Sequence, residues 1–275
     1  MIKESTINNV TVKPLVTVSN DSTKIKGYKL IPSLYGCTFL CAKRQSGKTS
    51  TLAEILKNTC DKNTKFFIFC PTHRVDSSWV ALVDMLESKG SEVNLFDSLI
   101  EGKTNLLSEI IDDLQVPEDA IVKKGNDPVP IGTKLKFEDP DAIKQKKEYK
   151  PKKTAPKHIF VFDDISMELR NPAVGQLCKM SRHIKASVYI SSQWVMDLAP
   201  QTIKQLSYFF CFRSFSRDKL EHIHKLLDLS IDLEKFYDIY DYVFKDGGQY
   251  DFLYIDVRNQ KYRKNFNKEI VFDDI

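Results

Sequence analysis

One short stretch of the sequence places a glycine, a lysine and a hydroxyl residue at the spacing of a phosphate-binding loop. Residues 42–49 read AKRQSGKT, close to the template G-x-x-x-x-G-K-[ST]. In such a loop the backbone N–H groups bind phosphates, the lysine neutralises the β- and γ-phosphates, and the hydroxyl is a hard ligand for Mg²⁺. The expected nucleotide-binding residues are Ala42, Lys43, Arg44, Gln45, Ser46, Gly47, Lys48 and Thr49. The segment therefore predicts a site for ATP with Mg²⁺, in which Thr49 is a metal ligand.

The loop departs from the template at its first position, where Ala42 replaces glycine. A methyl group is tolerable there if the backbone φ stays negative. The alternative interpretation is an ordinary helix N-terminus with an exposed lysine. The context favours the loop, because an apolar strand pattern (37–42) precedes it and a helical pattern (47–59) follows it.

A second cluster of chemical groups ends an apolar segment, IFVFDD, at residues 159–164. A buried strand that ends in two carboxylates needs a reason, because burying charge is costly unless it is paired or bound to metal. We interpret Asp163 as the Mg²⁺ residue and Asp164 as the base that activates the attacking water. The alternative is a solvent-exposed strand end or a helix N-cap.

Gln193 ends another apolar segment, SVYISS at 187–192. At the carboxyl edge of a parallel sheet, its amide could orient water or sense the γ-phosphate. The alternative is a polar loop residue without a catalytic role.

These groups need a scaffold that brings strand ends together, and the alternation of apolar segments with helical patterns supplies one. Strands are expected at 37–42, 65–70, 92–96, 158–162, 187–192, 208–212 and 250–257. Helices are expected at 47–59, from Asp76 to Gly90, near 105–115, at 166–181 with an interruption at Pro172, near 200–207, at 217–228 and at 232–244. Strands that are apolar throughout predict a three-layer α/β domain around a mainly parallel sheet.

The domain is expected to span residues 35–275, preceded by an N-terminal arm at 1–34. Residues 116–157 break the rhythm with repeated prolines and lysines, and we interpret them as an insertion. Lysine-rich segments bind phosphate backbones without reading sequence. The candidate DNA-binding residues are Lys144, Lys146, Lys147, Lys150, Lys152 and Lys153. The alternative is a solvated loop that keeps the protein soluble.

The bulk composition is that of a globular protein that acts inside a cell. Hydrophobic residues make up 42% of the chain, and the net charge of +4 is too small to prove a nucleic-acid partner. No apolar run approaches the length of a membrane span, and the first residues lack a signal core. The six cysteines form no CxxC pair, which predicts buried, reduced thiols. We therefore expect a protein that is neither secreted nor transmembrane.

Taken together, AKRQSGKT, HIFVFDD and SRHIKASVYISSQ at 181–193 resemble the FtsK–HerA superfamily of ring ATPases. The likeness is to its viral branch, the DNA-packaging ATPases of poxviruses, giant viruses and virophages, and it covers roughly residues 35–215. Many families share the phosphate loop, so the Arg-His pair before a strand that ends in glutamine is the more discriminating feature. Asp164 stands where many cellular members have glutamate.

The resemblance implies a RecA-like core, a homo-oligomeric ring, and ATP-driven movement of double-stranded DNA into a preformed capsid. It also implies contact with capsid or portal-vertex proteins, and a location in the host cytoplasm, at virus factories, and in the virion. An arginine finger acting across subunits is implied as well. By motif position this role falls on Arg182, with Arg170, Arg213 and Arg217 as rivals.

Two other functions remain open from the residues alone. A P-loop kinase for nucleosides or nucleotides would need an acceptor pocket and a lid, whereas the adjacent acids and Gln193 favour water as acceptor. A protein that binds ATP without hydrolysing it, and that gates DNA binding or capsid assembly, would carry the same loop.

Overall fold

The computed structural model describes residues 24–115, 153–248 and 250–272. Within them, one large sheet runs in the order β11-β10-β9-β8-β1-β7-β6-β2-β3. Its strands are β1 (Cys37–Cys41), β2 (Lys65–Phe69), β3 (Glu92–Phe96), β6 (His158–Asp163), β7 (Ala186–Ser192), β8 (Leu206–Phe212), β9 (Phe252–Asp256), β10 (Lys261–Lys264) and β11 (Lys268–Ile270). The strands from β8 to β3 pair in parallel, as the sequence predicts.

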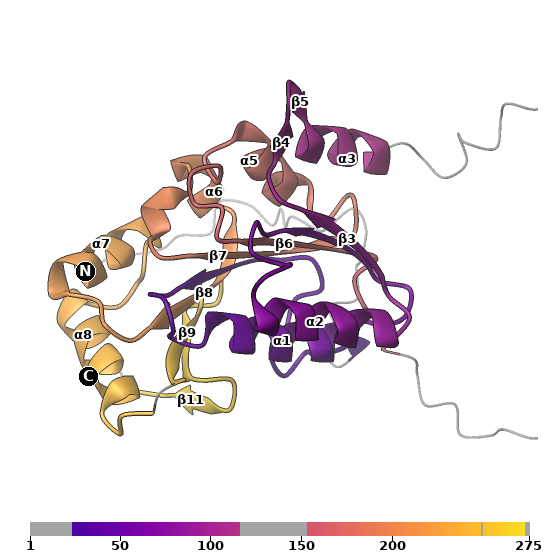
Figure 1. Ribbon diagram of the computed structural model, residues 1–275. Coiled ribbons are helices and arrows are strands. Elements are labelled where there is room, and N and C mark those ends of the chain that lie inside the picture. The colour runs from indigo at the N-terminus through magenta and orange to yellow at the C-terminus, as the bar shows by residue number, and fades with distance from the viewer. Residues whose placement is uncertain (1–23, 116–152, 249, 273–275) are drawn as a thin grey trace, which may run out of the picture.

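Helices cover both faces of the sheet and give the three expected layers (Figure 1). The helices are α1 (Lys48–Thr59), α2 (Ser77–Ser88), α3 (Leu106–Gln115), α5 (Pro172–Met180), α6 (Pro200–Ile203), α7 (Arg217–Leu226) and α8 (Leu233–Phe244). A 3₁₀ turn, η3 (Val195–Asp197), and a small hairpin of β4 (Ile100–Glu101) and β5 (Thr104–Asn105) complete the described elements. None of the helices in these segments combines the length and the apolar character that crossing a bilayer requires.

Two apolar cores, one on each face of the sheet, explain why the central strands read as continuous hydrophobic runs. Along β1, Phe39 and Cys41 pack on the face that α3 and α5–α8 cover, whereas Leu40 packs on the face that α1 and α2 cover. Successive side chains of a strand point to opposite faces, so a strand covered on both sides must be apolar at every position. All six cysteines are buried and free, as expected.

The helix expected from Asp76 to Gly90 is confirmed at both ends, whereas the one expected at 166–181 is not. Asp76 caps α2 by accepting a hydrogen bond from the Ser78 amide, and Gly90 adopts the left-handed conformation (φ 82°) just after that helix. Pro172 does not interrupt a helix that spans 166–181, which corrects that expectation. It occupies the first turn of α5, where a missing N–H costs nothing.

The C-terminal region contains more sheet than the sequence indicates. The expected last strand is β9, and it runs antiparallel to β8. Beyond the last expected strand, the chain forms β10 and β11, which add a hairpin to the same sheet. At the other end of the chain, Ile31 is buried in the core with Leu52, Ile55 and Leu56 of α1, so residues 24–34 lie against the domain. The remainder of the predicted arm and residues 116–152 of the insertion lie outside the described residues.

Candidate functional site: a phosphate loop facing two carboxylates

The phosphate loop connects β1 to α1 at the carboxyl edge of the sheet, where open α/β sheets bind ligands. The Ser46 hydroxyl donates to the Lys43 carbonyl at 2.6 Å, which closes the loop on itself. Gly47 has a φ of 92° at the start of α1, a conformation that favours glycine. The left-handed glycine before a helix start is the local geometry that the sequence predicts for a phosphate loop.

Ala42 is accommodated without strain. Its φ is not positive, its side chain is fully buried, and its amide donates to the Ser192 carbonyl at 3.0 Å. Glycine is therefore not needed at the first position, because the backbone there is not left-handed and the methyl group fits within the core. The loop keeps its geometry through the hydrogen bond to β7.

Lys48, Asp163 and Asp164 come together as one charged cluster. The Lys48 ammonium lies 3.1 Å from Asp164 Oδ1 and 3.4 Å from Asp163 Oδ1. Asp163 is almost fully buried, whereas Asp164 has a side chain that is 44% exposed and a left-handed backbone (φ 56°). The sharp turn at Asp164 aims its carboxylate at the phosphate loop rather than along the strand.

The cluster places one positive and two negative charges where solvent is partly excluded. Burial works against the charged form of Lys48, but the carboxylates of Asp163 and Asp164 outweigh it and raise the pKa of the ammonium. Burial raises the pKa of Asp163, and Lys48 opposes that rise. Because Lys48 is held by the two acids, an incoming triphosphate must draw it away from them.

Asp163 has a second partner that sequence reasoning missed. The indole Nε1 of Trp79, in the first turn of α2, donates to Asp163 Oδ2 at 2.9 Å. Trp79 is fully buried, and it is separated from Asp163 by 84 positions in the chain. The hydrogen bond fixes the carboxylate so that Oδ1 faces Lys48.

The donor set fits the Mg²⁺ that the nucleotide site implies. Asp163 Oδ1 is buried and has no hydrogen-bond partner within the described residues, and Thr49 follows Lys48 in the first turn of α1. A carboxylate and a hydroxyl are hard oxygen ligands of the kind Mg²⁺ prefers. Asp163 and Thr49 would hold the ion, which supplies charge neutralisation on the phosphates.

Sheet order explains how Gln193 reaches the same site. Strand β7 lies between β1 and β6, so its carboxyl end falls between the phosphate loop and the acidic pair. The Cys41 thiol donates to the Gln193 carbonyl at 3.8 Å, which ties the two strand ends together. The Gln193 side chain is exposed at this edge of the sheet, and its role with water stays a prediction.

On the other side of β1, an aromatic ring covers the loop. A Cβ placed on Gly47 would lie 2.5 Å from Cδ1 of Tyr250, so the ring packs directly against the glycine. Tyr250 is 57% exposed and precedes β9. Sequence reasoning missed this residue, because nothing in its local pattern indicates that it meets a loop 200 positions away.

The candidate arginines occupy different edges of the sheet. Arg182 is exposed at the amino end of β7, and its side chain forms no hydrogen bond or ion pair among the described residues. A strand of seven residues spans about 23 Å, so Arg182 does not reach the phosphate loop of its own chain. Each rival is held instead: Arg170 by the Met196 carbonyl, Arg213 by the Phe244 carbonyl and Arg217 by Asp241.

Of the six candidate DNA-binding lysines, the structure describes Lys153 alone. Its ammonium lies 5.2 Å from the centre of the Tyr28 ring, next to the bridge between Ile25 and Thr154. Residues 144–152 lie outside the described residues, so their contact with DNA stays a prediction.

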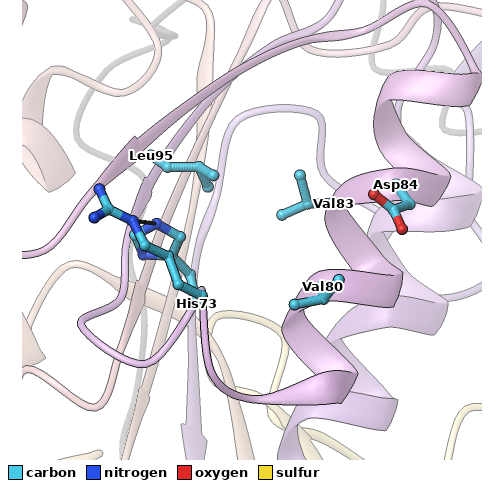
Figure 2. A pocket seen from close by; sticks show the side chains of 6 residues that line it. His73, Val80, Val83, Asp84 and Leu95 are labelled. Atoms are coloured by element: carbon cyan, nitrogen blue, oxygen red, sulfur yellow. Dashed lines mark hydrogen bonds between the residues drawn. The ribbon is translucent and has the colours of Figure 1, made fainter.

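A cavity of about 290 Å³ lies beside the sheet, between α2 and the segments after β2 and within β3 (Figure 2). It is lined by His73, Arg74, Val80, Val83, Asp84 and Leu95. Arg74 donates to His73 at 3.1 Å, as the dashed line in Figure 2 shows. The lining includes no residue of the phosphate loop, so this cavity is not the nucleotide site.

Comparison with solved structures shows which proteins share this fold. The genome packaging NTPase B204 from Sulfolobus turreted icosahedral virus 2, in complex with AMP, matches with a TM-score of 0.53 and 16% identity, over 87% of this chain and 100% of that chain. The DNA-packaging ATPase B204 from Sulfolobus turreted icosahedral virus matches with a TM-score of 0.52 and 16% identity, over 84% and 96%. The AMPPCP complex of the first protein gives 0.51 and 16%, over 85% and 98%.

No protein-family model and no curated protein matches the sequence. The fold is that of a RecA-like P-loop NTPase, a mainly parallel sheet between helices with the phosphate loop at its carboxyl edge. The resemblance to viral DNA-packaging ATPases that the motifs indicate is confirmed at the level of fold.

Proposed function

We propose that this protein is an ATP-driven motor that moves double-stranded DNA into a preformed viral capsid. The observation that carries the proposal is the convergence of Lys48, Asp163, Asp164 and Gln193 at one sheet edge, with β7 between the loop and the acids. The fold it shares with two viral packaging NTPases supports the same conclusion.

Hydrolysis would use these groups in fixed roles. The loop amides and Lys48 hold the β- and γ-phosphates, and Gln193 orients a water molecule in line with the γ-phosphorus. The water oxygen bonds to phosphorus, the bond to the β–γ bridging oxygen breaks, and Asp164 takes the water proton. Bound Mg²⁺ supplies charge neutralisation on the phosphates.

Arg182 would complete the site of a neighbouring subunit. Its guanidinium is exposed, has no partner in the described parts of its own chain and lies far from its own loop. A fixed positive charge from the neighbour would stabilise the negative charge that develops on the γ-phosphoryl group. This arrangement requires a ring, which would dock on capsid or portal-vertex proteins in the cytoplasm of the infected host.

The deciding experiment measures ATP turnover with and without linear duplex DNA, together with particle mass in the presence of ATP. We expect DNA to stimulate hydrolysis, and we expect a particle whose mass equals that of several chains, as a ring requires. Phosphorylation of a nucleoside or nucleotide would instead identify a kinase. Nucleotide binding without turnover would identify a gated DNA-binding or assembly protein.

A further inference from the structure

Tyr250 reaches the nucleotide site through the antiparallel arm of the sheet. Strand β9 runs against β8 with Phe252 opposite Phe212, so the start of β9 lies at the same edge as the end of β8. Strand β8 also pairs with β1, with Cys211 opposite Cys41. A residue just before β9 therefore lies beside the loop that follows β1, and the ring of Tyr250 packs there against Gly47.

The segment that carries Tyr250 is anchored by a charge cluster. The Lys264 ammonium, on a side chain that is 7% exposed, lies 3.0 Å from Asp246 Oδ2 and 3.3 Å from Asp251 Oδ2. Asn265 donates to the other oxygen of Asp251 at 2.9 Å. A Cβ on Gly248 would lie 2.5 Å from the Asp251 carboxylate, so a larger residue there would push this carboxylate aside. These contacts tie Asp246 and Asp251 to the β10 end of the sheet.

The order of strands around β1 indicates which end of the nucleotide meets the ring. Asp163, Asp164 and Gln193 come from β6 and β7, on one side of β1, and they mark the γ-phosphate end. Tyr250 lies on the other side of β1, with β8 and β9. A triphosphate that lies along the loop with its γ-phosphate at the acids therefore directs its nucleoside toward Tyr250.

We propose that Tyr250 forms the platform on which the base of the bound nucleotide stacks. This inference rests on the proposed nucleotide site and adds its base-binding part. Tyr250 is 57% exposed, so part of the residue is open to contact with a ligand. Stacking uses the π-face that every base has. The contact therefore favours purines because their rings are larger, and it does not depend on hydrogen bonds to the edge of the base.

The test compares the affinity of ATP with that of inorganic tripolyphosphate, which has the phosphates but no base. In Tyr250→Ala we expect ATP affinity to fall about 5- to 150-fold, the range for loss of one base–aromatic stack, while tripolyphosphate affinity stays unchanged. Tyr250→Phe keeps the ring and should bind ATP within about twofold of the parent. Tyr242→Ala is the matched control, because Tyr242 is 59% exposed on α8 and should leave both affinities unchanged.

Three outcomes would overturn the proposal while leaving the nucleotide site intact. The first is unchanged ATP affinity in Tyr250→Ala. The second is an equal loss of affinity for ATP and tripolyphosphate, which would mean that the ring shapes the loop. The third is tighter ATP binding, which would mean that the ring obstructs the site. If the parent protein binds neither ATP nor tripolyphosphate, the proposed function fails, and the base platform fails with it.

Discussion

The indole N–H of Trp79 donates a hydrogen bond to Asp163 Oδ2 at 2.9 Å, deep in the protein and 84 positions away in sequence. One carboxylate oxygen is thereby fixed, and the other, Oδ1, is left buried without a hydrogen bond among the described residues, 3.4 Å from Lys48. The pair links α2 to the end of β6, so helix packing controls the orientation of the Asp163 carboxylate.

Trp79→Phe should raise the Mg²⁺ concentration needed for nucleotide binding by about 10- to 100-fold, the usual effect of losing a hydrogen bond to a metal ligand. The substitution keeps an aromatic ring but removes the only N–H donor of the side chain. Equilibrium ATP binding titrated with Mg²⁺ measures the effect directly. Trp194→Phe is the control, since Trp194 stacks on His222 and makes no hydrogen bond to Asp163 in the described part of the chain. An unchanged Mg²⁺ midpoint in Trp79→Phe would reduce Trp79 to a packing residue.

Asp164→Asn should bind ATP at least as tightly as the parent but hydrolyse it about 10²- to 10⁴-fold more slowly. An amide does not take a proton from water, while the loss of one negative partner makes Lys48 more available to the phosphates. Steady-state turnover and equilibrium binding, measured on the same preparation, separate the two effects. Lys48→Ala provides the contrast, because it should lose ATP affinity itself. Near-normal turnover in Asp164→Asn would refute the assignment of the base.

Arg182→Ala should bind ATP normally and form rings, yet lose about 10³- to 10⁵-fold in hydrolysis rate. Because Arg182 lies at the opposite sheet edge from its own loop, mixing this variant with Lys48→Ala should restore part of the activity. Some interfaces in mixed rings then pair an intact loop with an intact arginine. Arg217→Ala tests a rival in the same assay, and we expect near-normal turnover because Arg217 is already paired with Asp241 at the surface. Mixed subunits that stay inactive would argue against action across subunits, and normal turnover by Arg182→Ala would turn attention to Arg213 or Arg217.

Duplex DNA binding should weaken steeply with salt if the lysine-rich insertion contacts phosphates. Changing Lys146, Lys147, Lys150 and Lys152 to alanine should make the slope of log affinity against log salt concentration shallower by about 3–4. The reason is that fewer phosphates are then neutralised, so binding releases fewer counterions. The slope should be similar for unrelated DNA sequences. The control variant changes four described lysines on or next to α7 and α8: Lys219, Lys225, Lys235 and Lys245. A slope that falls only in the control would assign the insertion to a solvated loop and move DNA contact to α7 and α8.

The sequence by itself determined the parts of the site that depend on local backbone. Gly47, Lys48 and Thr49 are recognisable because the loop needs a left-handed glycine and a helix start within a few residues, and the structure has both. The apolar run that ends at Asp163 predicts a buried strand, because a sheet covered by helices on both faces tolerates apolar residues at every position. Because all the buried strands are apolar in this way, the sequence predicts a parallel sheet but does not determine the order of its strands.

Only the tertiary structure decided which strands are neighbours, and hence which distant side chains meet. The position of β7 between β1 and β6 brings Gln193 between the loop and the acids, and it results from the packing of whole elements rather than from any local pattern. Helix α2 brings Trp79 to Asp163, and the antiparallel strand β9 brings Tyr250 to Gly47. The polar residues of β10 and β11 become strands because β9 offers them a free edge for hydrogen bonding. Contacts between residues 84 to about 200 positions apart depend on how the layers pack. The spacing of those residues in the sequence does not determine that packing.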